Sequence, residues 1–177
     1  QEKLEFKMKI EVALKTALEY EIRVREAYVE ACDETDDPIG KRIFGLLAEE
    51  EDGHVKFLEH QISKWKESGK LALERLETAL PKSTEIQKEV EKFEAKLSNE
   101  DHNKEIALLE KAQQAELETT TYYKKLVNEL EDDGKTLFKR FVEIEEGHLA
   151  LAQAELDSLT GSGHWFDMRE FDVGHRY

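Results

Sequence analysis

The chain has 177 residues, with 26 Lys and Arg against 41 Asp and Glu, so its formal charge at pH 7 is −15. A surface this acidic repels nucleic acid and anionic lipid, which excludes both as primary partners. The single cysteine, Cys32, excludes an internal disulfide and a Cys-x-x-Cys metal centre, and no apolar stretch is long enough for a membrane span, so a cytoplasmic protein is expected.

The expected fold is all-α, because the chain has only 2 Pro and 9 Gly and is 38% charged. Four long segments have the apolar spacing of amphipathic helices, and they cover about residues 4–34, 38–68, 103–131 and 134–159. Asp37 and Pro38 suit the N-cap and first position of the second helix, and Gly69 suits its end. Residues 69–101 break the pattern and contain a short helix over 83–97.

The long connection between the second and third of these helices bears on the topology. Two helix pairs joined in this way favour a ferritin-like four-helix bundle with a crossover. Asp-Asp-Gly at 132–134 is expected to form the tight turn before the fourth helix. Residues 1–163 are therefore predicted to form one bundle, with a C-terminal tail, 164–177, packing on it.

A short motif occurs twice, once in the second long helix and once in the fourth. Both copies read Glu-x-Gly-His: they are Glu51-Asp52-Gly53-His54 and Glu145-Glu146-Gly147-His148. When the second half of the sequence is aligned with the first, residues of the first and third helices also match: Glu21 pairs with Glu116, and Tyr28 pairs with Tyr123. One Glu-x-x-His would arise by chance in so acidic a chain. The repetition of core and ligand-type residues together predicts two related helix pairs.

The repeat predicts a site for two metal ions. Residues three apart share one face of a helix, so each Glu-x-x-His offers a carboxylate and an imidazole to one point. Four buried carboxylates would resist ionisation together, and two divalent cations would neutralise them. Such ligands suit iron or manganese, with zinc as a substitute, and the set matches ferritin-like di-metal proteins. The predicted ligands are Glu21, Glu51, His54, Glu116, Glu145 and His148.

Other interpretations exist for single members of this set. A lone glutamate could pair with Lys or Arg on a helix surface, and a lone histidine could be a hydrogen-bonded core residue; the register across the repeat favours the di-metal site. Tyr28 and Tyr123 either pack in the core or donate a hydrogen bond to a ligand carboxylate. Gly53 and Gly147 each weaken a helix by about 1 kcal/mol relative to Ala, which suggests close helix approach or room for a small oxidant.

These residues make the chain resemble the rubrerythrin branch of the ferritin-like superfamily. The resemblance also extends to the tail, where 165–171 looks like the ending of stand-alone members. It implies a non-haem di-iron centre bridged by Glu51 and Glu145. Glu21 and His54 would lie mainly on one iron, and Glu116 and His148 on the other. It further implies a homodimer in which hydrogen peroxide or dioxygen oxidises the diferrous centre.

The chain departs from that family at several positions. It lacks the four-cysteine rubredoxin domain, so electrons would come from a separate electron-donor protein. Thr119 stands where rubrerythrins carry an extra glutamate, and Val24 is its repeat mate. Asp52 stands where bacterioferritin carries its haem-ligating Met, so no haem is expected. Two other functions remain open: an iron-binding or delivery protein without turnover, and a metal-free helical interaction module.

Overall fold

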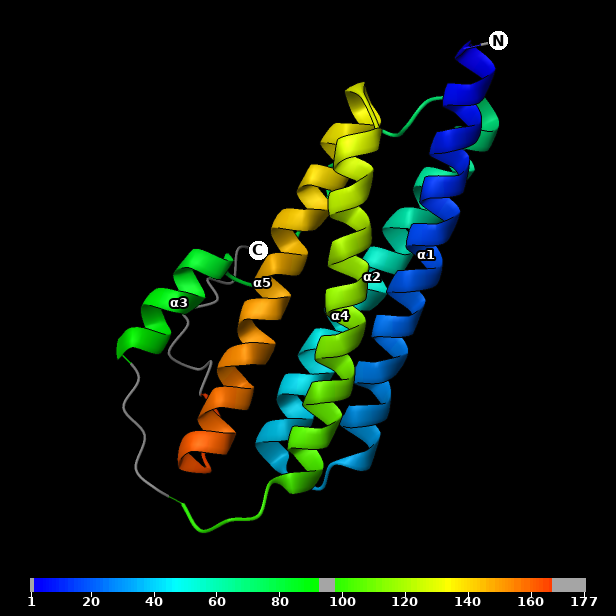
Figure 1. Ribbon diagram of the computed structural model, residues 1–177. Coiled ribbons are helices and arrows are strands. Elements are labelled where there is room, and N and C mark those ends of the chain that lie inside the picture. Colours follow the sequence, from blue (N-terminus) through cyan, green and yellow to red (C-terminus); the bar gives the residue numbers. More distant parts are fainter. Residues whose placement is uncertain (1, 93–97, 167–177) are drawn as a thin grey trace.

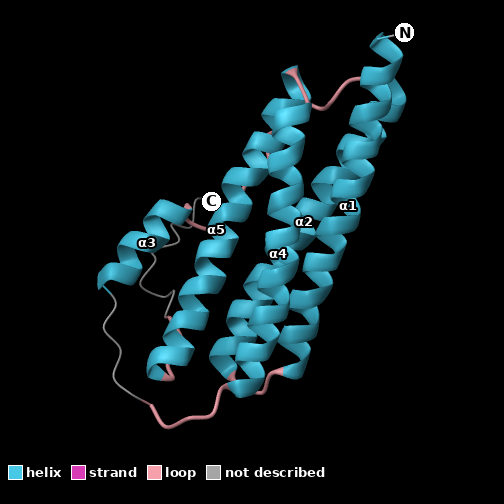
Figure 2. Cartoon of the chain, in the orientation of Figure 1, coloured by secondary structure: helices cyan, strands magenta, loops and turns pink. Residues whose placement is uncertain are grey.

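The computed structural model describes residues 2–92 and 98–166, and this part of the chain contains helices and no strand (Figures 1 and 2). The expected all-α class is thereby confirmed. The helices are α1 (Glu2–Glu34), α2 (Pro38–Ser68), α3 (Ser83–Lys92), α4 (Asn103–Glu129) and α5 (Asp132–Ser162). Within the described residues, no helix has the length and apolar character needed to cross a lipid bilayer.

Four of the helices are long and lie side by side. α1 packs against α2 and α4, α4 packs against α5, and the short α3 packs against the outer side of α5 (Figure 1). α1 and α5 run in one direction, whereas α2 and α4 run in the other. Because α2 and α4 are parallel, the connection between them returns along the length of the molecule and carries α3 on its way.

Both ends of α2 lie where the sequence places them. The Asp37 carboxylate accepts hydrogen bonds from the backbone N–H groups of Ile39 at 2.8 Å and Gly40 at 2.9 Å, which caps the first turn. Gly69 follows the last turn with a φ of +65°, in the left-handed region that glycine adopts without strain. Its N–H donates to the carbonyl of Trp65.

The turn between α4 and α5 differs from the prediction. It consists of Leu130 and Glu131, so α4 ends two residues earlier than expected and α5 begins two residues earlier. Gly134 therefore lies in the first turn of α5. A Cβ atom there would approach Cδ1 of Ile10 to 2.5 Å, so this glycine allows α1 and α5 to pack closely and is not needed for a turn.

The other end of α5 extends to Ser162, three residues beyond the predicted end. Beyond it, Trp165 and Phe166 are buried in the core, and the N–H of Phe166 donates to the Glu155 carboxylate at 2.8 Å. These two residues pack on the helices as expected for the tail, whereas 167–177 lie outside the described residues. The predicted short helix over 83–97 is α3, which ends at Lys92; 93–97 are likewise not described.

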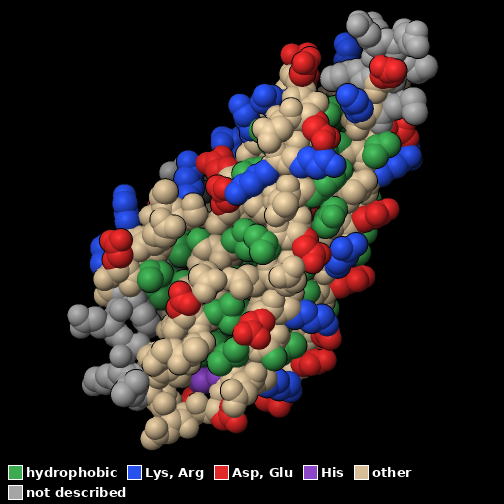
Figure 3. Space-filling model, viewed as in Figure 1, with side chains coloured by type: hydrophobic (Ala, Val, Ile, Leu, Met, Phe, Trp, Pro, Cys, Tyr) green, Lys and Arg blue, Asp and Glu red, His purple; other side chains and the backbone are tan. Residues whose placement is uncertain are grey.

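The buried apolar side chains form two clusters along the helices. One cluster contains Ala17 of α1 and Leu58 of α2, and the other contains Val24 of α1 and Leu47 of α2. The buried polar side chains of each helix lie between the two clusters. Charged side chains instead occupy the outer face, where acidic and basic groups are interspersed (Figure 3).

Candidate metal centre

The six predicted ligands meet between the two apolar clusters. α1 and α4 each bring one glutamate, and α2 and α5 each bring a glutamate and a histidine one helical turn apart. Each of the six is at most 1% exposed, although it is a charged or titratable side chain. Residues this polar are rarely buried so completely without a partner of opposite charge.

The six side chains form two groups that share two members. Glu51 and Glu145 belong to both groups; Glu21 and His54 complete one, and Glu116 and His148 complete the other. Within each group, one donor atom from each residue lies within 4.8 Å of the others. Each group could therefore hold a metal ion, and the two ions would be neighbours joined by shared carboxylates.

The two imidazoles turn the same nitrogen toward the carboxylates. Nδ1 of His54 lies 3.2 Å from a Glu21 oxygen, 3.1 Å from Glu51 and 3.0 Å from Glu145. Nδ1 of His148 lies 2.6 Å from a Glu51 oxygen. The two rings are nearly parallel, with 5.3 Å between centroids and 5° between planes. Nδ1 of His54 and Nδ1 of His148 therefore both face the part of the core that holds the carboxylates.

Two buried tyrosines tie the helix pairs together. The Tyr28 hydroxyl on α1 donates to the Glu116 carboxylate on α4 at 2.9 Å, and the Tyr123 hydroxyl on α4 donates to Glu21 on α1. The sequence left open whether these tyrosines pack in the core or donate a hydrogen bond to a carboxylate, and the structure shows the hydrogen bonds. Each tyrosine fixes a carboxylate of the opposite helix pair.

Hydrogen bonds satisfy only part of this cluster. The two tyrosines donate to two carboxylate oxygens, and Nδ1 of each imidazole lies within hydrogen-bond distance of another. Both oxygens of Glu145, one of Glu51 and one of Glu116 receive no hydrogen bond from the described residues. Buried carboxylate oxygens without donors are costly, and cations are what would compensate them. The donor set therefore fits divalent metal ions on its own chemistry.

The pKa values of the two shared carboxylates, Glu51 and Glu145, are shifted in the opposite direction from that of Glu21. Burial and the neighbouring Glu116 charge raise the pKa of Glu51 to about 7, and burial and Glu51 raise the pKa of Glu145 well above its ordinary value. Burial also acts on Glu21, but the charge of His54 and hydrogen bonds outweigh it and lower that pKa. The protonated form is therefore favoured more at the shared positions than at Glu21, and a cation bound there would displace the proton.

A seventh donor was not found from the sequence. Glu50 on α2 directs its Oε2 to within 3.8 Å of Nε2 of His148, and it forms a third group with His54 and His148. Its carboxylate accepts hydrogen bonds from Thr78 and the backbone of Ala79, and although burial acts against it, these bonds and His148 lower its pKa to about 2. The sequence did contain one signal for Glu50: it departs from the repeat, because its counterpart in the second copy is the apolar residue Ile144.

The two glycines before the histidines do not behave alike. A Cβ atom on Gly147 would lie 3.0 Å from the carbonyl oxygen of Pro81, whereas a Cβ on Gly53 would meet no described atom within 4 Å. The proposal of close helix approach is thus wrong for Gly53. For Gly147 the close neighbour is the connection before α3 and not another long helix.

Packing residues occupy the two positions that were compared above with an extra glutamate of rubrerythrins. Thr119 and Val24 are fully buried, and the Thr119 hydroxyl donates to the backbone carbonyl of Ala115 at 2.8 Å. Neither residue belongs to a donor group in the described part of the chain. The extra carboxylate near this centre comes instead from α2, at Glu50.

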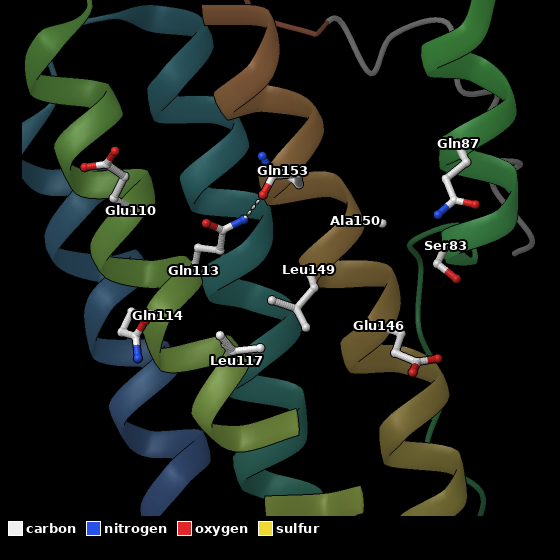
Figure 4. Close-up of a pocket in the computed structure, with 10 residues that line it drawn as sticks. All are labelled: Ser83, Gln87, Glu110, Gln113, Gln114, Leu117, Glu146, Leu149, Ala150 and Gln153. Carbon is white, nitrogen blue, oxygen red and sulfur yellow. Dashed lines mark hydrogen bonds between the residues drawn. The ribbon is translucent and has the colours of Figure 1, made fainter. Parts of the chain in front are cut away.

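The groove between α3, α4 and α5 is separate from this centre. It has a volume of about 500 Å³ and is lined by glutamines, two glutamates and small or apolar side chains (Figure 4). Gln113 and Gln153 join α4 to α5 by a 2.7 Å hydrogen bond within it. None of the six donors lines the groove.

Comparison with known protein families, characterised proteins and solved structures finds no match for this chain. The resemblance to rubrerythrins therefore rests on the residues and motifs of the sequence. The donor groups themselves fit divalent cations that accept oxygen and imidazole ligands.

Proposed function

We propose that this chain is a ferritin-like four-helix bundle with a crossover, that it holds two iron ions, and that it acts as a non-haem di-iron oxidoreductase of rubrerythrin type. It would reduce hydrogen peroxide or dioxygen. The observation that carries the proposal is the sharing of Glu51 and Glu145 between two donor groups. Carboxylates shared in this way would hold two cations side by side.

The charge of the site supports a pair of ferrous ions. The four carboxylates carry four negative charges when ionised, and two ferrous ions carry four positive charges, so the loaded core would be neutral. Two ferrous ions held there would supply the two electrons that, with two protons, reduce one hydrogen peroxide to two waters. Electrons for the next cycle would come from a separate donor protein.

The protein side chains have three tasks in this proposal. The glutamates and Nδ1 of each histidine bind the cations. Tyr28 and Tyr123 fix the orientation of Glu116 and Glu21, because each donates a hydrogen bond to one oxygen of its carboxylate. The two apolar clusters exclude bulk water, which strengthens the electrostatic interactions between the donors and the cations.

The arrangement of the helices also favours the proposed fold. α2 and α4 run parallel, and the long connection between them carries α3. This is the topology that separates ferritin-like proteins from simple up-and-down bundles. The paired Glu-x-x-His motifs then lie on α2 and α5, with single glutamates on α1 and α4.

Anaerobic loading with ferrous iron, followed by desalting and elemental analysis, tests the proposal. We expect about two iron ions per chain, and almost none in a variant that combines Glu51→Gln with Glu145→Gln. Glutamine keeps the volume of glutamate and removes its charge, so a matched helical circular dichroism spectrum is the control for folding.

Turnover then separates an enzyme from an iron-binding or delivery protein. The loaded protein is mixed with peroxide or with dioxygen, and a chemical reductant is supplied in excess. Consumption of many oxidant molecules per chain supports the oxidoreductase. Binding of two irons with a single oxidation event would instead identify a binding or delivery protein, and no retained iron would defeat the metal centre itself.

A further inference from the structure

We propose that Glu50, His54 and His148 form a third cation position at the edge of the centre, through which divalent cations load into the two inner positions. The inference rests on the metal-binding part of the proposed function and does not depend on redox activity. One carboxylate oxygen of Glu50 and one ring nitrogen of each histidine lie within 4.8 Å of one another.

The distance between Glu50 and His148 fits a shared cation. Their closest atoms, Oε2 and Nε2, are 3.8 Å apart, which is too long for a direct hydrogen bond. Two ligands bound to one cation at about 2.1 Å each are about 3 to 4 Å apart, depending on the angle between the bonds. A cation between these atoms would therefore need little movement of either side chain.

One ring nitrogen of each histidine has no hydrogen-bond partner among the described residues. Nε2 of His54 and Nε2 of His148 are buried, and neither forms a hydrogen bond with a described residue. Their Nδ1 atoms face the inner carboxylates. A buried ring nitrogen without a partner is unfavourable, so a ligand on the Nε2 side would compensate both rings.

Glu50 links this position to the solvent. Its side chain is 11% exposed, whereas the six inner donors are at most 1% exposed. Hydrogen bonds from the Thr78 hydroxyl at 2.6 Å and the Ala79 N–H at 3.0 Å hold the carboxylate in place. The repeat mate, Ile144, offers no ligand, so loading would occur from the α2 side.

The same histidines cannot serve all three positions at once. A neutral imidazole has one lone pair and ligates through one nitrogen at a time. A cation at the outer position therefore competes with the inner positions for His54 and His148. As the inner positions fill, the outer one empties, and the final content stays at about two cations per chain.

The test is the rate of anaerobic cobalt(II) loading, followed by the visible absorption of the bound ion in a stopped-flow instrument. Glu50→Gln should slow loading on the order of tenfold, because a negative charge at the mouth of a buried site raises the association rate of cations. The final cobalt content, measured after desalting, should remain that of the unmodified protein. Glu50→Asp keeps the charge with a shorter reach and should load at an intermediate rate.

Two control variants separate the carboxylate from its surroundings. Glu49→Gln removes the same charge from the neighbouring, exposed residue of α2 and should leave the rate unchanged. Glu59→Gln removes an exposed charge farther along α2, and it should also load at the normal rate. Circular dichroism and thermal unfolding check that each variant is folded.

The outcomes distinguish this inference from the proposed function. Normal loading of Glu50→Gln and Glu50→Asp overturns the third position, as does equal slowing in Glu49→Gln, which would assign the effect to the general charge of α2. If the unmodified protein retains about two cobalt ions, these results leave the inner centre intact. If it retains none, the metal centre fails and the third position fails with it.

Discussion

The helix pair α1–α2 and the helix pair α4–α5 supply the same donors to the centre but differ in what surrounds them. Glu50 on α2 has Ile144 as its counterpart on α5. Gly53 is open to solvent, whereas Gly147 lies under the connection before α3. The donors are thus repeated while their environment is not. The connection between α2 and α4 adds to the difference, because Thr78 and Ala79 bind Glu50 on α2, whereas Pro81 lies against Gly147 on α5.

The largest expected effect concerns shared and unshared donors. Glu51→Gln and Glu145→Gln each remove a member of both donor groups, so each should abolish binding of both cations. Glu21→Gln and Glu116→Gln each affect one group and should leave about one cation per chain. Elemental analysis of desalted, anaerobically loaded variants measures the difference.

The two helix pairs would not be equivalent if Glu51→Gln and Glu145→Gln lost different numbers of cations. Loss of both cations from Glu51→Gln but of only one from Glu145→Gln would mean that α5 contributes to a single position. Each variant replaces a carboxylate by an amide of the same size, so the helical content of the cation-free proteins is the appropriate control.

The next effect is the pH dependence of stability in chelator-treated protein. The pKa of Glu51 is raised from 4.5 to about 7, so the folded state holds a proton that the unfolded state releases, and stability falls as pH rises through this window. The pKa values of His54 and His148 lie well above 6.5 despite burial, because of Glu51 and other nearby carboxylates, so their contribution is also lost as pH rises further. The free energy of unfolding should fall by about a few kcal/mol between about pH 5 and pH 9.

Urea unfolding at several pH values measures this effect. Cobalt or zinc ions replace the displaced protons, so loaded protein should show a flatter profile over the same range. Glu51→Gln and Glu145→Gln should each flatten the profile of the cation-free protein. Stability that rises with pH in the chelator-treated protein would contradict the assigned protonation of both shared carboxylates.

A smaller effect is expected from the two tyrosines. Tyr28→Phe and Tyr123→Phe each remove one hydrogen bond to a carboxylate of the opposite helix pair. Each should weaken cation affinity by about tenfold, and by similar amounts, as measured by competition with a coloured chelator. Tyr122→Phe is the matched control, because Tyr122 stacks on Tyr20 near the surface. A tenfold loss in that variant would assign the effect to packing.

Much of the fold and the inner donor set could be predicted because both depend on helical periodicity. The bounds of α2 follow from Asp37, Pro38 and Gly69, and the repeat places the six donors on inward faces. Glu50 was not predicted, although its apolar counterpart Ile144 was a signal, because it reaches the centre from a position flanking the inner stripe and is held by a loop that folds back from farther along the chain. The turn before α5 was misplaced because Gly134 serves close packing and not a turn.

The smallest expected effect contrasts the two glycines of the repeated motif. Gly53→Ala should stabilise the protein by about 0.5 to 1 kcal/mol, because alanine favours the helix and its methyl group meets open space. In Gly147→Ala the same gain is opposed by the Pro81 carbonyl oxygen, 3.0 Å from the new methyl group, so stability should be unchanged or lower. Urea unfolding of both variants, at equal metal content, gives the difference. An equal gain at both positions would show that the connection yields easily at Gly147, and the environments of the two helix pairs would then be alike at this point of the repeat.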